Sequence, residues 1–386
     1  MNFIKFIKKE KRIIYHAGAW AGNFGDSILE QSIKNNLVKC TNKELDFRYI
    51  NCQKTEFTKE LIDQMNNEGD MLLIGGGGLV FFRPQDNSKS GWQWNIDINL
   101  IDEIKVPIVV YGIGYNQFEF DTSNFLHITN KHLQKTVEKA RLFSVRNTGT
   151  KNELIKRGCN GNKIEVIPDC GMFLPARSIQ IPCIDNEKLK VAINWTTDRE
   201  NQTFPEPFPE TKESFIDILI DLFNYLIENE NAQIFYIGHM CESFDRDIID
   251  TLERRLVNAP IVIDRELSDI YPPAAEKAGY IVDIYRQMDI VYGMRGHANI
   301  VSFGQNTPFI GIGSHPKIRY FLSDIGREKY FFDARKDKNE FNFEKAKELT
   351  LDILNNYEGQ KRNMDIEYKR QKEILRIFNK KVIRLL

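Results

Sequence analysis

The stretch of sequence that decides the fold runs from Asp289 to Gly326 and reads DIVYGMRGHANIVSFGQNTPFIGIGSHPKIRYFLSDIG. Two short apolar runs in it, over residues 289–292 and 307–312, are typical of buried strands. Each run is followed by a segment with helical spacing, the first starting at Ala298 and the second at His315. Strand, turn and helix repeated in this order predict a parallel α/β sheet.

A turn between the first of these strands and its helix carries an arginine and a histidine. Gly293 and Gly296 punctuate the turn, and Arg295 and His297 lie beside them. Ligands of open α/β sheets bind at the carboxyl ends of the strands. The free N–H groups that begin a helix also favour anions. The turn therefore predicts an anion site that includes a proton carrier.

The composition is that of a globular protein. A length of 386 residues is enough for two domains of ordinary size, and 42% hydrophobic with 28% charged residues does not suit a disordered chain. The formal net charge of -1 gives no global attraction to nucleic acid, so an anion site must be local. Six scattered cysteines without a C-x-x-C pair predict free thiols.

Neither a membrane span nor a signal peptide is expected. No apolar run is long enough to cross a bilayer, and the first residues, MNFIKFIKKEKR, lack the apolar core of a signal peptide. We therefore expect a cytoplasmic protein. Phe3, Ile4, Phe6 and Ile7 among the lysines could make a weak peripheral contact with the inner face of a membrane, although a basic lead-in to the first strand is favoured.

Strands and helices alternate twice along the chain, which predicts two Rossmann-like lobes facing an interlobe cleft. Residues 1–178 form the first lobe, and residues 188–335 restart the pattern after a linker that contains prolines. Residues 336–386 are helical and highly charged, as in a segment that packs back on the lobes. The predicted strands cover residues 12–16, 45–50, 70–74, 106–111, 141–145, 163–167, 191–195, 233–237, 261–264, 289–292 and 307–312.

Two glycine-rich loops follow strands of the first lobe. The earlier loop contains Asn23 and Asp26, which could hold the hydroxyl groups of a ligand or simply cap the following helix. The later loop begins with four glycines, from Gly75 to Gly78. Such a run is costly unless a ligand or the other lobe needs the bare backbone close by, so Gly76 and Gly77 are candidate ligand contacts.

The long loop after the glycine run contains Trp92 and Trp94. These rings could stack on a sugar, although aromatic side chains more often pack in a core or an interface. His127 and His132, on a later helix, are interpreted as ordinary surface residues.

A second arginine occupies a junction like that of Arg295. Arg146 follows the fifth strand and lies just before a helix. Physical reasoning alone therefore predicts a two-lobe enzyme in which Arg146, Arg295 and His297 converge on an anionic small molecule. His16 and His239 also end strands, and either is a candidate for a second proton carrier.

Four stretches, in order, resemble the polysaccharide pyruvyl transferase family. The first two are GNFGD at residues 22–26 and GGGG at residues 75–78. The third is VRNTGTKNEL at residues 145–154, with a Pro-Asp pair at 168–169, and the last is the closing motif MRGH…PFIGI…KIRYFL at residues 294–322. Three positions depart from the family pattern: Asn147 replaces an aspartate, Thr150 replaces a serine, and Gly296 replaces a bulkier residue.

The resemblance implies a fold similar to the two-lobe, type B glycosyltransferases. It also implies transfer of pyruvate from phosphoenolpyruvate to sugar hydroxyls, which forms a ketal on a surface glycan, such as a capsule, exopolysaccharide or cell-wall polymer, or on its lipid-linked precursor. The first lobe would hold the acceptor and the second lobe the donor.

The same resemblance implies roles for particular residues. Arg146 and Arg295 would bind the phosphate and carboxylate of the donor, with Lys317 as a further contact, because guanidinium forks match planar oxygen groups. His297 would carry a proton, since a histidine titrates at about pH 6.5. Arg199 roughly matches an arginine expected after the first strand of the second lobe. We expect no cofactor besides the donor substrate, and no metal, because no cluster of ligands has metal-binding spacing.

Two other functions stay open at this stage. A glycosyltransferase with a nucleotide-sugar donor could use the same fold, but it would need a base and ribose pocket that no motif marks. A glycan-binding protein without activity could also keep the fold. The acceptor sugar, the position of the ketal and the oligomeric state are not predicted, and no nucleic-acid partner is expected.

Overall fold

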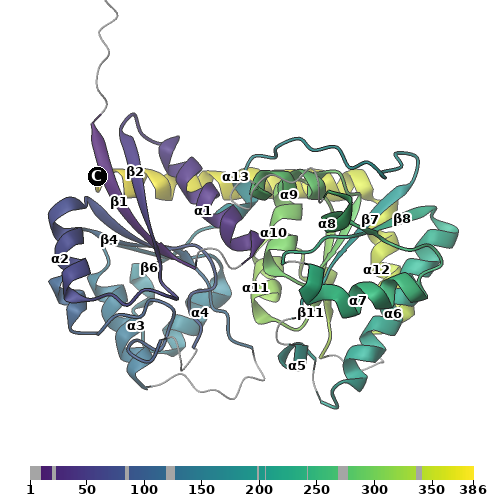
Figure 1. Ribbon diagram of the computed structural model, residues 1–386, viewed down its shortest axis with the longest axis horizontal. Helices are drawn as coiled ribbons and strands as arrows, with labels where there is room; N and C mark the ends of the chain where they lie inside the picture. The colour runs from purple at the N-terminus through teal and green to yellow at the C-terminus, as the bar shows by residue number, and fades with distance from the viewer. Residues whose placement is uncertain are drawn as a thin grey trace, which may run out of the picture.

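The computed structural model describes residues 10–19, 23–82, 87–118, 127–197, 200–204, 206–240, 242–267, 277–335 and 341–386. These residues form two six-stranded sheets, one beside the other, with helices packed around them (Figure 1). Neighbouring strands in both sheets run parallel. The predicted α/β fold class is therefore confirmed.

The first sheet has the strand order β2-β1-β3-β4-β5-β6. Its two central strands β3 and β4 are buried along their whole length, which explains why their sequences are continuous apolar runs. Its strands are β1 (Lys11–Gly18), β2 (Glu44–Asn51), β3 (Met71–Gly75), β4 (Ile108–Ile113), β5 (Leu142–Val145) and β6 (Ile164–Val166). The helices of this part are α1 (Phe24–Val38), α2 (Lys59–Glu68), α3 (His127–Lys139) and α4 (Thr148–Lys156), with the short 3-10 helices η1 (Leu100–Glu103), η2 (Gly161–Lys163) and η3 (Cys170–Phe173).

The second sheet has the strand order β12-β11-β10-β7-β8-β9. Its strands are β7 (Leu189–Asn194), β8 (Ala232–Tyr236), β9 (Ile261–Val262), β10 (Ile290–Gly293), β11 (Phe309–Gly313) and β12 (Phe331–Asp333). Its helices are α5 (Glu200–Thr203), α6 (Glu210–Asn229), α7 (Glu242–Arg255), α8 (Ile263–Glu266), α9 (Lys277–Arg286), α10 (Gly296–Gly304) and α11 (Pro316–Asp324), and the 3-10 helix η5 (Glu328–Tyr330) precedes β12.

Three details of the second sheet differ from the sequence prediction. The predicted strand over residues 261–264 pairs only at Ile261–Val262, and Ile263 already begins α8; both isoleucines are apolar, so the pattern could not separate strand from helix. Strand β12 was not predicted, because three residues are too few for a periodicity. Helix α10 begins at Gly296 rather than Ala298, which places His297 in its first turn.

The chain ends in two helices, α12 (Phe343–Asn355) and α13 (Tyr357–Ile383), and α13 passes behind both sheets (Figure 1). Near its start, the Gln360 amide oxygen accepts a hydrogen bond from Arg327 of the second lobe at 2.8 Å. Near its end, Asn379 accepts one from the Tyr111 hydroxyl of β4 at 2.6 Å. The helix therefore connects the two lobes.

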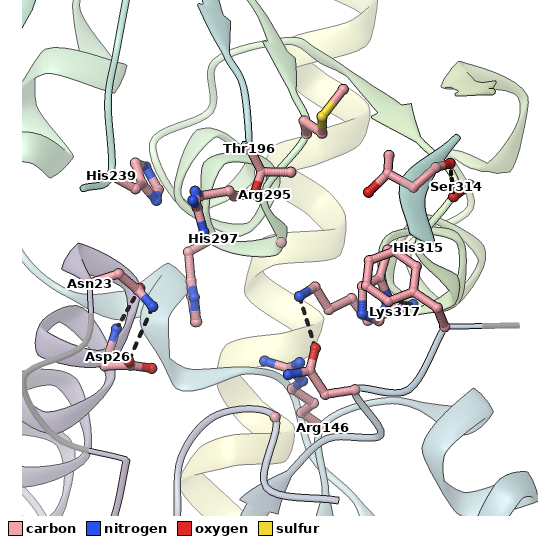
Figure 2. A pocket seen from close by; sticks show the side chains of 16 residues that line it. Asn23, Asp26, Arg146, Thr196, His239, Arg295, His297, Ser314, His315 and Lys317 are labelled. Carbon is pink, nitrogen blue, oxygen red and sulfur yellow. Dashed lines mark hydrogen bonds between the residues drawn. The ribbon is translucent and has the colours of Figure 1, made fainter. Parts of the chain in front are cut away.

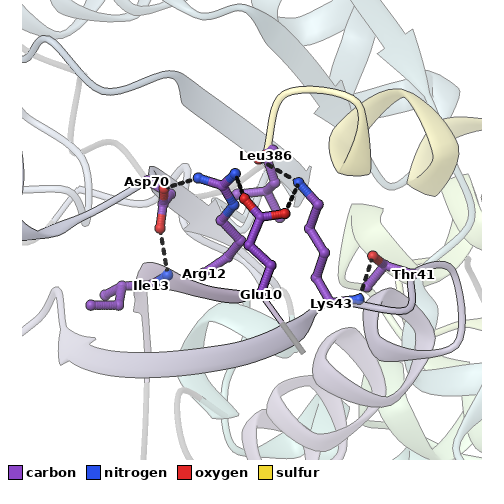
Figure 3. Close-up of polar contacts among 7 residues, drawn as sticks. All are labelled: Glu10, Arg12, Ile13, Thr41, Lys43, Asp70 and Leu386. Atoms are coloured by element: carbon purple, nitrogen blue, oxygen red, sulfur yellow. Dashed lines mark hydrogen bonds and ion pairs between the residues drawn. The ribbon is translucent and has the colours of Figure 1, made fainter. Parts of the chain in front are cut away.

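The C-terminal residue lies beside the first strand of the chain (Figure 3). The ammonium group of Lys43 donates to the main-chain oxygen of Leu386 at 3.0 Å and lies 3.3 Å from the Glu10 carboxylate. On the same strand, Arg12 donates to Asp70 at 2.8 Å. These groups are partly solvent-exposed, so they position the chain end and contribute little to stability. In the part of the chain that the structure describes, none of the helices is long and apolar enough to span a membrane.

We expect the contact between α13 and the first sheet to contribute several kcal/mol to stability. Phe378 is 1% exposed, and its ring centroid lies 5.5 Å from that of Tyr111. Phe378→Ala should therefore lower the free energy of unfolding by about 3–5 kcal/mol, measured by urea denaturation. The neighbouring Ile377 is 48% exposed, so Ile377→Ala is a matched control and should change stability by about 0.5 kcal/mol or less. Equal losses in the two variants would contradict this expectation.

Candidate active site

A cavity of about 130 Å³ lies between the two lobes, at the carboxyl ends of the strands (Figure 2). The strand order changes direction between β1 and β3 in the first sheet, and between β7 and β10 in the second. Such switch points are where open α/β sheets bind ligands, and here both open onto the same cavity. It is lined by Asn23, Asp26, Gly78, Asn116, Phe118 and Arg146 of the first lobe, and by Thr196, Thr203, His239, Met294, Arg295, Gly296, His297, Ser314, His315 and Lys317 of the second.

His297 extends from the first turn of α10 to residues of the other lobe. Two glycines of the first lobe make room for its ring. A Cβ atom on Gly25 would lie 2.2 Å from Nδ1 of His297, and one on Gly171 would lie 3.4 Å from Cδ2. The other ring nitrogen, Nε2, is buried and lies 3.6 Å from Oδ2 of Asp169. The first lobe therefore fixes the orientation of a side chain that belongs to the second.

Asp169 is a buried carboxylate at the start of η3, and its side chain is 2% exposed. Its Oδ1 accepts the backbone N–H of Gly171 at 3.0 Å, and its Oδ2 accepts Nη1 of Arg146 at 3.1 Å. Burial alone would raise the pKa of Asp169, but His297, Arg146 and the Gly171 N–H hold that pKa well below its usual value. The Asp169 carboxylate is therefore ionised at neutral pH.

Asn23 and Asp26 lie where α1 begins and also line the cavity. The side-chain oxygen of Asn23 accepts the backbone N–H of Asp26 at 3.3 Å, and the Asn23 amide donates to the Asp26 carboxylate at 3.1 Å. Burial raises the pKa of Asp26 to about 6, against the opposing effect of His297, Lys317, Arg146 and Arg295. Capping the helix and facing a ligand are thus compatible roles for these two residues.

The positively charged groups of the cavity come from both lobes. Arg295 is the residue before α10, and its backbone N–H donates to Oδ1 of Asn194 at 3.1 Å. The ammonium group of Lys317, at the start of α11, donates to Asn116 of the first lobe at 2.9 Å. With Arg146, the described residues that line the cavity include three permanent cations and one carboxylate, that of Asp26. This balance suits a ligand with more than one negative charge.

The glycine run serves mainly to turn the chain beneath α1. Gly76 and Gly77 have φ angles of +80° and +89°, which other residues rarely adopt. A Cβ atom on Gly76 would lie 3.0 Å from the side chain of Ile33. Of the four glycines, Gly78 lines the cavity, whereas Gly76 and Gly77 do not. A direct ligand contact for Gly76 or Gly77 therefore stays a prediction.

Neither His16 nor His239 is suited to carry a proton near neutral pH. His16 is fully buried away from the cavity, its Nε2 lies 3.1 Å from the Gly75 carbonyl oxygen, and burial lowers its pKa to about 3. His239 lines the cavity with Nε2 2.7 Å from the hydroxyl of Tyr285. Burial, together with Arg295 and His297, holds the pKa of His239 well below its usual value. Both imidazoles are therefore neutral at pH 7.

The aromatic loop of the first lobe belongs to the core. Trp92 and Trp94 are both fully buried, so stacking on a sugar is excluded for them in this arrangement. Trp92 donates its indole N–H to Nδ1 of His132 at 2.8 Å. The prediction that His132 lies on the surface is therefore wrong: the loop folds over α3 and covers it, which helical periodicity cannot reveal. The side chain of His127 and all of Arg199 lie outside the described residues.

Asp169 belongs to one of the family motifs, but the sequence predicted no role for it. Its position in the turn after a strand was the available signal, since polar residues there reach the ligand edge of a sheet. His315 was also missed, although it lines the cavity and its ring centroid lies 4.2 Å from that of Phe118. Among the described residues, no group of three His, Cys, Asp or Glu side chains is placed to hold a metal ion. The described cysteines are free thiols: Cys40, Cys52, Cys159, Cys170 and Cys183.

Several solved structures share the fold at low sequence identity. UDP-GlcNAc 2-epimerase from Neisseria meningitidis, bound to UDP-GlcNAc, aligns with a TM-score of 0.53 and 10% identity over 97% of this chain and 99% of its own. The epimerase from Methanocaldococcus jannaschii, with UDP-GlcNAc and UDP, gives 0.51 and 11% over 89% and 93%. Anabaena HepE in complex with UDP gives 0.52 and 7% over 97% and 98%. At these identities the likeness shows a fold like that of the type B glycosyltransferases and nothing of the ligand.

Sequence comparisons give a more specific result. No curated protein matches the chain at a significant level. Residues 23–316, however, match the family described as polysaccharide pyruvyl transferase. This range contains the cavity residues from both lobes, with the exception of Lys317 at its end. The chain is therefore a transferase that belongs to the polysaccharide pyruvyl transferase family.

Proposed function

We propose that this protein transfers the pyruvyl group of phosphoenolpyruvate to two hydroxyl groups of a sugar in a surface glycan or its lipid-linked precursor. The observation that carries the proposal is the convergence of three permanent cations, a histidine and a carboxylate of raised pKa on one interlobe cavity. Membership of the family supports the same reaction class.

The cations suit the donor because phosphoenolpyruvate carries a phosphate and a carboxylate on the same carbon atom, C2. Arg146 and Arg295 can each present two N–H groups to a planar or tetrahedral oxyanion, whereas Lys317 offers a point charge. Arg146 is already paired with Asp169. Arg295 lies directly before helix α10, and its guanidinium can bind an oxyanion through two N–H groups, so we assign the strongest donor contact to Arg295.

Ketal formation needs one group that supplies a proton and one that accepts a proton. Protonation of the methylene carbon of the donor gives a methyl group and an electron-poor C2, which a sugar hydroxyl attacks as its proton is removed. A second hydroxyl then replaces the phosphate at C2, and its proton leaves with the phosphate. Asp26, with a pKa of about 6, suits the first proton transfer, and His297 suits the removal of the hydroxyl proton.

Calorimetric titration of phosphoenolpyruvate into the wild type and Arg295→Ala tests the donor site. We expect the variant to bind about 10- to 150-fold more weakly, because a hydrogen-bonded charge contributes about 1.5–3 kcal/mol. Arg254→Ala, at an exposed position on α7, is the control and should bind like the wild type. A wild type that ignores phosphoenolpyruvate but binds UDP or a UDP-sugar would reject the proposal in favour of a glycosyltransferase.

Two glycines next to His297 provide a matched test of its placement. A Cβ atom on Gly25 would displace the imidazole, whereas one on Gly296 would lie 3.5 Å from Lys317, an ordinary contact. Gly25→Ala should therefore lower phosphate release from phosphoenolpyruvate and a glycan acceptor by about 10²-fold, since a misplacement of roughly 1 Å has that effect. Gly296→Ala should keep most of the activity. Similar activities in the two variants would argue against a catalytic role for His297.

The raised pKa of Asp26 predicts a pH-dependent effect on stability. A folded-state pKa of about 6 against an ordinary value of 3.8 means that stability is lost as the pH rises through this window. Asp26→Asn removes this loss, so the variant should gain about 1–3 kcal/mol over the wild type between pH 4 and pH 7 while its activity falls. Asp250→Asn, at an exposed position on α7, is the control. Urea denaturation at a series of pH values measures the free energy of unfolding of the wild type and of both variants. A difference between Asp26→Asn and the wild type that does not change with pH would contradict the raised pKa of Asp26.

A further inference from the structure

We propose that Asp169 is a positioning residue that sets the tautomer of His297 and neutralises Arg146 with the same carboxylate. The inference rests on the proposed function for its catalytic meaning, but its geometric content concerns three side chains that the structure brings together. Asp169 lies three residues after β6 and precedes η3, Arg146 follows the neighbouring strand β5, and His297 comes from the second lobe.

The tautomer follows from the surroundings of the ring. Nε2 of His297 is buried, and within the described part of the chain it has no hydrogen-bond partner; Oδ2 of Asp169, at 3.6 Å, is its ion-pair neighbour. An ionised carboxylate only accepts hydrogen bonds, so Nε2 must carry the hydrogen. Catalytic contacts of this length commonly shorten when the substrate binds. The lone pair is then on Nδ1, the nitrogen next to Gly25 at the α1 end of the cavity.

This arrangement gives His297 a defined task. Nδ1 takes the proton of the attacking sugar hydroxyl as its oxygen bonds to C2 of the donor, and the imidazolium that results is stabilised by the carboxylate behind it. The proton then returns from the imidazolium to Asp26, which gave its own proton to the donor, and this restores the neutral ring; the proton of the second hydroxyl leaves with the phosphate. Asp169 keeps its charge throughout and touches no reacting atom, as expected of an orienting carboxylate.

The same oxygen of Asp169 also compensates Arg146. Oδ2 accepts Nη1 of Arg146 at 3.1 Å, while Oδ1 is fixed by the Gly171 N–H at 3.0 Å. Removing the negative charge would thus leave Arg146 uncompensated and make the cavity more positive. Loss of Asp169 should therefore impair proton transfer while anion binding is kept or strengthened. A residue that merely supports the fold would weaken both.

Asp169→Asn tests the proposal, because asparagine has nearly the same shape but can donate a hydrogen bond to Nε2. In the wild type, ¹⁵N NMR of the His297 ring should show hydrogen on Nε2; in the variant the hydrogen should move to Nδ1. The dissociation constant for phosphoenolpyruvate should stay equal or decrease, while turnover with a glycan acceptor should fall by about 10²- to 10⁴-fold.

Asp283→Asn is the matched control. Asp283 is also buried, accepts a backbone N–H, that of Ile179, at 3.0 Å, and pairs with Arg286, but it is not among the residues that line the cavity. It should destabilise the fold without changing the His297 tautomer or donor binding. A wild-type ring with hydrogen on Nδ1 would overturn the proposal even if Asp169→Asn did not fold, as would a parallel loss of donor binding and turnover in the variant. A wild type that shows the Nε2 hydrogen but binds no phosphoenolpyruvate would instead reject the proposed function.

Discussion

The buried negative charge of Asp169 constrains the arrangement of the groups around it. Moving a carboxylate out of water costs several kcal/mol unless cations and hydrogen-bond donors replace the solvent. Arg146 and the Gly171 N–H do so from the first lobe, and His297 completes the set from the second. Separating the lobes would remove part of this compensation. The charge therefore favours the closed arrangement that also forms the cavity.

Close packing around His297 and Arg146 depends on glycines, which have no side chain, as much as on charges. Gly25 leaves space for the ring of His297, and Gly114 leaves space for the guanidinium of Arg146, where a Cβ atom would lie 2.1 Å from Nε. Helix α13 contacts both lobes, through Gln360 at one end and Asn379 at the other. The lobes are thus connected in two places, by the long helix α13 and by the charged groups of the cavity.

The fold and much of the cavity can be predicted from the sequence, but the contacts between the lobes cannot. Apolar runs that alternate with helical segments are enough to predict two α/β units, because the burial of each strand is visible in its own residues. Arg146, Arg295 and His297 could be placed near one another, since each lies where a strand passes into a helix. Asp169 could not be given its role, and the burial of His132 could not be foreseen, because both depend on segments distant in sequence. The hydrophobic periodicity of a single segment gives no information about such contacts.

Asp26 and Asp169 are the same residue type, but the protein shifts their pKa values in opposite directions. Burial dominates for Asp26 and raises its pKa to about 6, whereas charge compensation dominates for Asp169 and keeps it ionised. If phosphoenolpyruvate is the donor, its negative charges would also oppose ionisation of Asp26 and would screen the cations that now favour it. Both effects raise the pKa of Asp26 further. Donor binding would thus keep the acid protonated at the pH at which the empty cavity begins to lose that proton.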